Sequence, residues 1–480
     1  MVPCPGHGHL IPFVEFAKRF LLLHNNNNGV FFHVTLLVPT HGPPSPSAIA
    51  ILNALPPNMD FIFLPSVTMD NIPNPPTHPI PRMKLILQLS LPSLRQSLTS
   101  LSSKTTLVAL VSHFFSIDAL PLAKEFNIFS CVLYTAGATS LSFSLSFPML
   151  DKEKINHDHQ ESLDLPKTVN VSGCPVSFQV KDLPDLVHFP RSSEIYKSYL
   201  DACRSLTLVD ILILNSFNHL EGEAIQAIQR GKTSSGLTGP SVYSIGPIIQ
   251  TESSNEANKL DCVTWLDNQP PKSVVYICFG SGGTISHEQV NEIAHGLELS
   301  GHRFLWVIRP PSKISGSAYL VTKKEDPLEY LPSGFLDRTK GQGLVVPSWA
   351  PQIEILAHGS TGAFLSHCGW SSAMESIIHG VPIIAWPLFA EQKMNAVLFT
   401  DVLRVALRAQ QSDAENGGNI VVTREQVAEV VKRILESDEG LEVRKRTREL
   451  SDAASLAVTQ NGSSNMGLSS LAQKWLESIA

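Results

Sequence analysis

The chain has 480 residues, of which 43% are hydrophobic and 16% charged, and this composition is that of a globular protein rather than a disordered one. At about 150 residues per domain, the length predicts two or three domains rather than one. The formal net charge of −7 argues against a nucleic-acid partner, which requires a basic surface.

The seven cysteines are scattered along the chain, and no two of them form a C-x-x-C pair. Their odd number favours reduced thiols over a disulfide framework or a zinc site, so we expect a cytoplasmic protein without a metal cofactor. No apolar run approaches the ~18 residues of a membrane span. The amino end also lacks the charged and then apolar layout of a signal peptide. We therefore expect no membrane span.

Apolar runs with the length of strands alternate with amphipathic helical stretches along the chain, and this alternation is typical of doubly wound parallel sheets. The stretches Ser286–Gln289 and Thr423–Gln426 have the spacing of capping boxes that open helices. In chain order the strand-like runs are 31–39, 59–65, 106–112, 129–135, 210–216, 273–281, 303–309, 343–349, 362–367 and 381–387.

The polar stretch at 250–260 is the best candidate for a linker, because it is poor in apolar residues and separates two α/β halves. We predict an amino-terminal domain at 1–249 and a carboxyl-terminal domain at 261–455. Ligands of such folds bind at the carboxyl ends of parallel strands and in clefts between domains.

Three strand ends in the second half carry polar or glycine-rich loops, namely "FGSGGTIS" (279–286), "SHCGWSSAME" (366–375) and "WPLFAEQ" (386–392). If the three strands are neighbours, these loops converge at one edge of the sheet. They would then offer amides and hydroxyls to a phosphate at the start of a helix, Trp faces to a ring, and carboxylate and amide groups to sugar hydroxyls.

Each feature also has a simpler interpretation. Ser372 and Glu375 have the spacing of a capping box that begins a helix. The three tryptophans Trp349, Trp370 and Trp386 can be ordinary core residues.

Two interpretations of this segment as the active site of a hydrolase also remain open. The run "GWSSA" (369–373) resembles the G-x-S-x-G nucleophile elbow, with Ser371 as the nucleophile, but it lacks the second glycine. Cys368 beside His367 suggests a thiol nucleophile only if the two side chains meet, which neighbours in a turn need not do.

Residues 349–392 read "WAPQIEILAHGSTGAFLSHCGWSSAMESIIHGVPIIAWPLFAEQ", and this segment is similar over its whole length to the 44-residue signature box of plant family 1 glycosyltransferases. Further segments resemble the branch of that family that glucosylates phenolics, hydroquinone and monolignols, so the resemblance covers nearly the whole chain. These segments are 8–20, 279–286, 331–352 and 390–408.

The resemblance implies the GT-B fold, in which two Rossmann-like domains with doubly wound parallel sheets face each other across a cleft. The acceptor is then bound by the amino-terminal domain and the UDP-sugar donor by the carboxyl-terminal domain. It also implies a carboxyl-terminal helix at 456–480 that packs back on the amino-terminal domain.

The resemblance also gives a role to each residue that matches the donor site of the family. The amino ends of helices favour negative charge, so residues at such positions suit the diphosphate of the donor. By resemblance, Trp349 stacks on uracil, Ala350 meets its edge, Gln352 and Glu375 bind the ribose hydroxyls, Ser281, His367 and Ser372 hold the diphosphate, Trp370, Glu391 and Gln392 face the sugar, and Thr135 lies near sugar and diphosphate.

Two of these positions carry information about the donor. By resemblance, a glutamine at position 392 indicates that the sugar of the donor is glucose, which is the commoner case in the family. Ser371 stands where most members have Asn, so a hydroxyl replaces a longer amide beside the phosphates, and we expect this to weaken donor binding by ~1 kcal/mol.

The family works by an inverting displacement, in which a His base takes the acceptor's proton while the acceptor oxygen attacks the anomeric carbon and UDP departs. His9 matches this base, and Ala390 lies among the acceptor-binding positions. A phenol with a pKa of ~10 loses its proton uphill to an imidazole near 6.5, so the base requires a carboxylate partner. Where the family has that Asp, this chain has His113, which could still fix the tautomer of His9 by accepting its hydrogen bond.

Members of the family have about ten more residues at the amino end, so we expect a truncated first strand and exposed ladder groups on its neighbours.

The first functional hypothesis is a UDP-glucose-dependent glucosyltransferase of plant secondary metabolism, which transfers glucose to a hydroxyl of a small phenolic acceptor of the hydroquinone, monolignol or flavonoid type. UDP-glucose is a co-substrate, and no cofactor or metal is expected. The alternatives are a catalytically weak or inactive UDP-sugar-binding homologue, because His113 replaces the acid, and a C-glycosyltransferase. The sequence leaves the acceptor and the oligomeric state open, and we expect a monomer.

Overall fold

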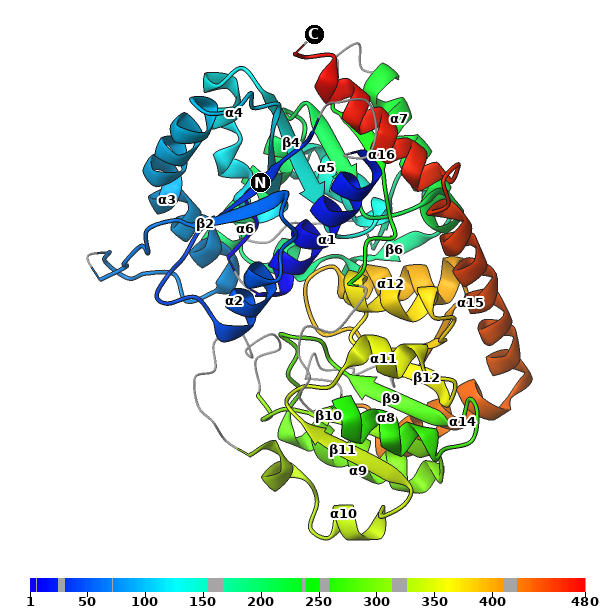
Figure 1. The fold of residues 1–480 in the computed structure, drawn as a ribbon. Helices are drawn as coiled ribbons and strands as arrows, with labels where there is room; N and C mark the ends of the chain where they lie inside the picture. Colours follow the sequence, from blue (N-terminus) through cyan, green and yellow to red (C-terminus); the bar gives the residue numbers. More distant parts are fainter. Residues whose placement is uncertain are drawn as a thin grey trace. The chain divides into compact units, whose positions relative to one another are not determined.

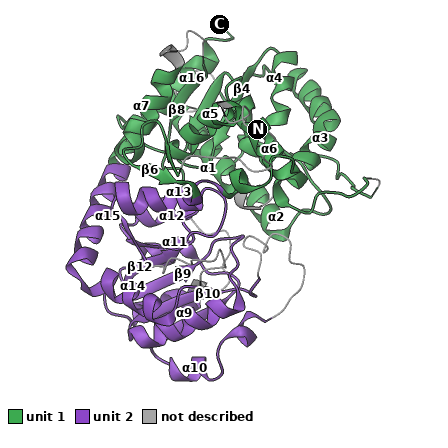
Figure 2. Ribbon diagram, turned by 180° about the vertical axis from the view of Figure 1, so that it is seen from behind, with its two compact units in different colours: residues 1–180, 185–250, 456–480 green, residues 181–184, 251–455 purple. Residues whose placement is uncertain are grey.

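The chain folds into two compact units, which Figure 2 shows in different colours. Unit 1 consists of residues 1–180, 185–250 and 456–480, and unit 2 consists of residues 181–184 and 251–455. The computed structural model describes residues 1–5, 7–24, 31–70, 72–153, 167–234, 239–250, 259–312, 326–409 and 421–479, with only the backbone described at 7–9, 153, 232–234 and 259.

Unit 1 is an α/β unit, and Figure 1 labels many of its elements. Its strands are β1 (Val34–Val38), β2 (Met59–Phe63), β3 (Ala109–His113), β4 (Phe129–Tyr134), β5 (Thr168–Asn170), β6 (Ser177–Gln179), β7 (Ile211–Leu214) and β8 (Ser241–Ser244). Its α-helices are α1 (His7–His24), α2 (Pro46–Asn53), α3 (Pro79–Ser102), α4 (Pro121–Glu125), α5 (Ala138–Glu153), α6 (Glu194–Leu206), α7 (Asn218–Ser234) and α16 (Ser463–Leu476).

The strands of unit 1 form a parallel sheet in the order β3-β4-β7-β8, a parallel pair β1-β2 and a short antiparallel pair β5-β6. All five apolar runs predicted in the first half overlap one of these parallel strands. The strand β8 was missed, because its segment "SVYS" has only two apolar residues and carries no strand signal of its own.

The first two residues of the chain lie between β1 and β3. Leu37 N donates a hydrogen bond to Met1 O at 2.8 Å, Val2 N donates to Val111 O at 2.7 Å, and His113 N donates to Val2 O at 3.1 Å. The expectation of exposed ladder groups at this place is therefore wrong, because Met1 and Val2 satisfy them and join the two parallel sheets of unit 1.

Helices α1 and α16 contribute to one hydrophobic core of unit 1, although they lie at opposite ends of the chain. Phe20 of α1 packs against Trp475 of α16 with ring centroids 5.0 Å apart. Arg19 donates to Ile245 O at 3.0 Å and to Asn465 Oδ1 at 2.6 Å. The last helix is thus held by a buried aromatic contact and by hydrogen bonds from a charged donor, which are stronger than neutral ones.

Unit 2 is built on one parallel sheet of six strands in the described residues, in the order β11-β10-β9-β12-β13-β14. These strands are β9 (Val274–Cys278), β10 (Arg303–Ile308), β11 (Gly343–Pro347), β12 (Thr361–Ser366), β13 (Ile383–Ala385) and β14 (Ala406–Arg408). The helices are α8 (Lys259–Asp267), α9 (His287–Ser300), α10 (Phe335–Arg338), α11 (Gln352–Ala357), α12 (Trp370–Ile378), α13 (Gln392–Val397), α14 (Arg424–Glu436) and α15 (Asp438–Ala457).

The sheet of unit 2 is covered on both faces, as the near-continuous apolar runs of its strands predict. Side chains alternate along β9: Val275 and Ile277 pack with α9 and α14, whereas Val274 and Tyr276 pack with α8 and α11. This is the doubly wound arrangement predicted from the sequence. Only β14 among these strands was not predicted, since its apolar residues lie between Arg404 and Arg408 rather than inside a longer apolar run like that of β13.

Of the two predicted capping boxes, one is confirmed and one is half wrong. At α14, Thr423 accepts from the main chain of Gln426 and the Gln426 side chain bonds back to Thr423 N. At α9, Ser286 accepts from Gln289 N, but the Gln289 amide instead bonds the main chain of Val422. The tertiary contact with Val422 therefore replaces the bond that the Gln289 side chain would make to the main chain of Ser286.

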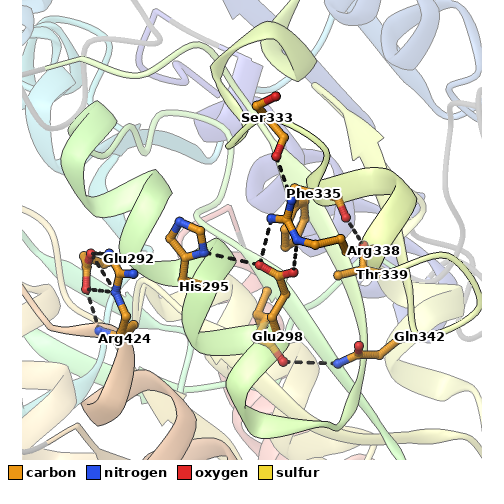
Figure 3. Close-up of polar contacts among 10 residues, drawn as sticks. Glu292, His295, Glu298, Ser333, Phe335, Arg338, Thr339, Gln342 and Arg424 are labelled. Atoms are coloured by element: carbon orange, nitrogen blue, oxygen red, sulfur yellow. Dashed lines mark hydrogen bonds and ion pairs between the residues drawn. The ribbon is translucent and has the colours of Figure 1, made fainter.

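Charged side chains tie α9 to the elements on both sides of it (Figure 3). Glu298 accepts from Arg338 Nε at 2.6 Å and from His295 Nδ1 at 3.2 Å, and Glu292 forms an ion pair with Arg424. These partners lower the pKa of both carboxyls. Because α9 follows the glycine-rich loop 279–286, the ion pairs help to fix the helix that this loop opens.

No helix in the described part of the chain combines the length and the hydropathy that crossing a membrane requires.

Candidate active site

The polar loops predicted to converge in unit 2 do follow neighbouring parallel strands. The strands β11, β10, β9, β12 and β13 are consecutive in the sheet, so their carboxyl ends meet at one edge. Trp349 follows β11, Gly280 follows β9, His367 follows β12 and Trp386 follows β13. This edge is where open α/β sheets bind their ligands.

His367 packs closely against two glycines of this edge. A Cβ atom built on Gly280 would lie 2.5 Å from His367 Nε2, and one built on Gly369 would be closer still. Gly280 also has a φ of +72°, which only glycine adopts without strain. The two glycines are therefore required by the imidazole that lies between them.

The His367 ring is uncharged at neutral pH. Burial and, second to it, the charge of Arg309 lower the pKa of His367 to about 4. Its Nδ1 is buried and has no hydrogen-bond partner among the described residues. Buried polar atoms are nearly always paired, so this nitrogen is an exception among the described residues.

Gln352, at the start of α11, forms one hydrogen-bonded group with Ser372 and Glu375 of α12. Gln352 Nε2 donates to Glu375 Oε2 at 2.6 Å and to Ser372 Oγ at 3.0 Å. Tyr276 OH donates to Gln352 Oε1 at 3.4 Å. Burial raises the pKa of the Glu375 carboxyl to about 7, and the Gln352 hydrogen bond opposes the rise.

The interpretation of Ser372 and Glu375 as a capping box is wrong. Helix α12 begins at Trp370, so Ser372 lies inside the first turn rather than before it. The N-cap residue is Gly369, and it supplies no side-chain cap to the helix. The first amides of α12 are thus left for another acceptor, and helix N-termini favour anions.

The three tryptophans of the signature segment differ in exposure. Trp370 is only 3% exposed and stacks on Phe399, with ring centroids 6.1 Å apart, and Trp386 is buried as well. For these two rings the core interpretation agrees with the structure. Trp349 is half-buried, and the following Ala350 is buried. Trp349 therefore keeps an accessible surface that can stack on a base.

The loop between β13 and α13 contains the predicted sugar and acceptor positions. Gln392 is buried, and its Oε1 accepts from Leu388 N at 2.9 Å and from Phe389 N at 3.0 Å. These two bonds orient the amide and leave Nε2 as the group that can donate to a ligand. Ala390, with a φ of +57°, and Glu391 are both partly buried in the same loop.

The hydroxyls of Ser281 and Ser371 lie nearer to solvent. Ser281 is exposed directly after Gly280, and Ser371 is half-buried in the first turn of α12. Both therefore stand at the sheet edge described above.

In unit 1, two predicted residues follow neighbouring strands and contact each other. His113 ends β3 and is buried, Thr135 follows β4, and His113 Nε2 lies 3.2 Å from Thr135 Oγ1. Phe115 N donates to His113 Nδ1 at 3.1 Å. An amide can donate only to an unprotonated nitrogen, so the proton of neutral His113 is on Nε2.

This tautomer corrects one expectation from the sequence. Neutral His113 has one accepting nitrogen, and the Phe115 amide already uses it, so His113 acts as a donor from Nε2 rather than as an acceptor for His9. His9 belongs to α1, and its side chain lies outside the described residues.

The loop that carries Thr135 is held by Glu221, a residue that the sequence analysis missed. The Glu221 carboxylate is buried and accepts from Ala138 N at 2.7 Å, Thr139 N at 2.8 Å and Ser216 Oγ at 2.7 Å. It thereby occupies the start of α5. The sequence carries no signal for this role, since the two amides that Glu221 bonds are more than 80 residues away.

The structure does not support Cys368 or Ser371 as the nucleophile of a hydrolase. Burial raises the pKa of the Cys368 thiol to about 12, and Sγ donates to Ser366 O at 3.5 Å. A protonated, buried thiol is a poor nucleophile. Ser371 lies within α12 rather than on a nucleophile elbow.

Arg309, at the end of β10, is a second residue that sequence reasoning missed. Its guanidinium donates through Nη1 to Gly280 O and through Nε to Ser348 O at 3.2 Å. It thus connects the loops after β9 and β11. A single Arg at the end of a strand belongs to no sequence motif, so only the tertiary structure reveals that Arg309 connects the two loops.

Two doubly wound α/β units, one of which gathers these groups at the carboxyl edge of its sheet, define an enzyme of the GT-B type that uses a nucleotide-linked sugar. The chain belongs to plant family 1 of the UDP-dependent glycosyltransferases, and it is a UDP-glycosyltransferase. Residues 248–412 match the family described as UDP-glucoronosyl and UDP-glucosyl transferase.

The relatives cover the chain almost from end to end. A hydroquinone glucosyltransferase of Rauvolfia serpentina is 43% identical and covers 100% of this chain and 98% of its own length. UDP-glycosyltransferase 72B1 of Arabidopsis thaliana is 42% identical over 99% of this chain and 95% of its own. The structure of Phytolacca americana UGT2 with UDP-2fluoro-glucose and pterostilbene has a TM-score of 0.86, 40% identity and coverages of 99% and 98%.

Proposed function

We propose that the protein transfers glucose from UDP-glucose to a hydroxyl group of a small phenolic acceptor. The hydrogen bond between Gln352 and Glu375 carries the donor half of this proposal, because it aligns an amide and a carboxylate for two adjacent hydroxyls of a ribose. The phenolic acceptor is supported by the 43% identity to a hydroquinone glucosyltransferase.

In this proposal, unit 2 binds the donor through the edge of its sheet. Trp349 stacks on uracil, and the backbone of Ala350 bonds its edge. The diphosphate accepts hydrogen bonds from the amides at the start of α12 and from the hydroxyls of Ser281, Ser371 and Ser372. Neutral His367 donates one more, from the ring nitrogen that carries its proton.

The sugar is bound at the loop between β13 and α13. Gln392 donates from Nε2 to glucose hydroxyls, since its Oε1 is already used by the main chain. Glu391 accepts from other hydroxyls, and Thr135 of unit 1 contributes its hydroxyl near the sugar.

The chemical step follows from these assignments. His9 removes the proton of the acceptor hydroxyl, the acceptor oxygen forms a bond to the anomeric carbon, and the bond from that carbon to the diphosphate oxygen breaks, so that UDP leaves with the electron pair. Attack from the opposite face inverts the anomeric configuration. His113 donates to Thr135 and helps to orient its hydroxyl.

Several expectations remain predictions of this proposal. Transfer needs no metal, so dialysis against EDTA leaves the rate unchanged. The protein works in the cytoplasm, a proposal that the seven unpaired cysteines support. We further propose a monomer, which light scattering tests.

The test is incubation of the purified protein with UDP-glucose and a panel of phenols, with products analysed by mass spectrometry. We expect an added hexose and released UDP for at least one phenol. Products that survive acid would indicate transfer to carbon rather than oxygen. UDP binding in calorimetry without any hexose adduct would overturn the proposal and leave a binding protein.

A further inference from the structure

We propose that Arg309 is a positioning residue, which holds the loop that binds uracil and the loop that binds diphosphate in one fixed arrangement. This inference rests on the proposed function, since those two ligand groups define what the loops must align. Arg309 itself need not touch the donor.

The two hydrogen bonds of Arg309 end on the residues that precede the donor-binding side chains. Gly280, which accepts from Nη1, comes directly before Ser281, and Ser348, which accepts from Nε, comes directly before Trp349. One rigid guanidinium therefore spans both loops. A planar fork of donors suits this task better than a flexible ammonium group.

Both accepting residues have unusual backbone conformations. Gly280 has a φ of +72° and Ser348 a φ of +66°, which is an uncommon conformation for a residue with a side chain. These left-handed conformations turn the two carbonyl oxygens toward Arg309. Residues in such conformations persist only where the surroundings hold them.

A small pocket, with room for about one water molecule, lies beside the Gly280 loop. It is lined among others by Phe279, Gly280, Thr284, Trp306 and Arg309. Arg309 lines this pocket together with Gly280, so its side chain and the loop that it bonds border the same small space.

Arg309 also carries a positive charge. Within the described part of the chain, no carboxylate forms an ion pair with it, and its hydrogen bonds go to neutral carbonyl oxygens. A positive charge in this position also favours the anion that the neighbouring loop is proposed to bind. Arg309 thus makes two separable contributions: the clamp, by which we mean its two hydrogen bonds to Gly280 and Ser348, and its positive charge.

Two substitutions separate these contributions. Arg309→Gln removes both the charge and the clamp, whereas Arg309→Lys keeps the charge but can reach only one of the two carbonyl oxygens well. The matched control is Arg303→Gln, at the exposed opposite end of β10. Thermal unfolding of all variants shows whether each one is folded.

The measurements are UDP affinity by calorimetry and hydrogen exchange of the segments 279–284 and 346–352. We expect both Arg309 variants to bind UDP about 10- to 100-fold more weakly and to exchange faster in both segments, while Arg303→Gln matches the wild type. The pKa of His367, followed by NMR, should rise in Arg309→Gln and remain low in Arg309→Lys, because burial and the charge of residue 309 set it.

Unchanged UDP affinity or unchanged loop exchange in Arg309→Lys would overturn the clamp. The exchange measurement needs no ligand, so it judges the clamp even if the wild type fails to bind UDP. That failure would instead refute the proposed function.

Discussion

Donor binding should depend on pH through the carboxyl group of Glu375. Burial raises the pKa of this group to about 7, so its charge changes within the range in which the enzyme is handled. The ribose hydroxyls donate hydrogen bonds, and only the ionised carboxylate is a full acceptor for them. A ligand that prefers the ionised form lowers its pKa on binding, so affinity is highest above pH 7 and declines as the pH falls through it.

The size of the effect follows from the titration. With a pKa of about 7, about nine tenths of the groups are ionised at pH 8 and about one tenth at pH 6, so the Kd for UDP-glucose rises about tenfold between the two. His367 adds nothing to this change, because its pKa of about 4 keeps the ring neutral throughout. UDP-glucose is preferred to UDP as the ligand, since a terminal phosphate itself titrates near pH ~6.

The assay is calorimetric titration with UDP-glucose, without acceptor, at several pH values for the wild type and two variants. Glu375→Gln should bind about 10- to 100-fold more weakly at pH 8, the worth of a charged hydrogen bond at ~1.5–3 kcal/mol, and should lose the pH dependence. Glu288→Gln, an exposed change on α9, is the control and should behave as the wild type.

The same substitution should affect stability in the opposite direction. An acid whose pKa is higher in the folded than in the unfolded state opposes folding above its unfolded value, and more so as the pH rises. Glu375→Gln should therefore raise the melting temperature at pH 8 and do so less at pH 5. Wild-type affinity that is constant from pH 6 to 8, or an equal pH dependence in Glu375→Gln, would refute the assignment of this carboxylate to the ribose.

Three further changes test other parts of the structure. If an anion is the missing partner of the base, His113→Asp should raise kcat at least about tenfold, by analogy with the Asp of the serine-protease triad. The control His113→Asn should leave kcat unchanged. Equal rates in the two variants would show that the charge at this position does not limit the reaction. Gly280→Ala should weaken UDP binding and destabilise unit 2 by ~1–3 kcal/mol, because its Cβ would meet His367 and the backbone has a positive φ; Gly341→Ala, where the structure leaves open space, should cost only the backbone strain and keep UDP binding. Arg19→Met should lower the melting temperature and expose α16 to protease, since the hydrogen bonds of Arg19 are lost; an unchanged protease pattern would contradict this role of Arg19.

Much of the fold was readable from the chain itself. Buried parallel strands are apolar throughout, so the runs at 273–281 or 362–367 signal their own conformation. The capping box at Thr423 is equally local, because both partners lie within one turn. Short strands such as β8 and β14 were missed, since their pairing comes from the neighbouring strand rather than from their own side chains.

The candidate site was readable only in part, and the reason is again the range of the contacts. Gln352, His367 and Glu375 were found because they belong to one dense segment. Arg309 and Glu221 were not, because the carbonyl groups that Arg309 bonds and the two amides that Glu221 bonds lie 29 to 83 residues away along the chain.

The sequence by itself determined the α/β class, the positions of the longer strands and the segment that carries the donor chemistry, because each of these depends on residues within one element or one turn. Only the tertiary structure decided that Ser372 is no helix cap, that His113 carries its proton on Nε2, and that one guanidinium joins two loops. The physical reason is that hydrogen bonding and burial depend on which atoms meet, and in a doubly wound sheet those atoms come from strands far apart in the chain.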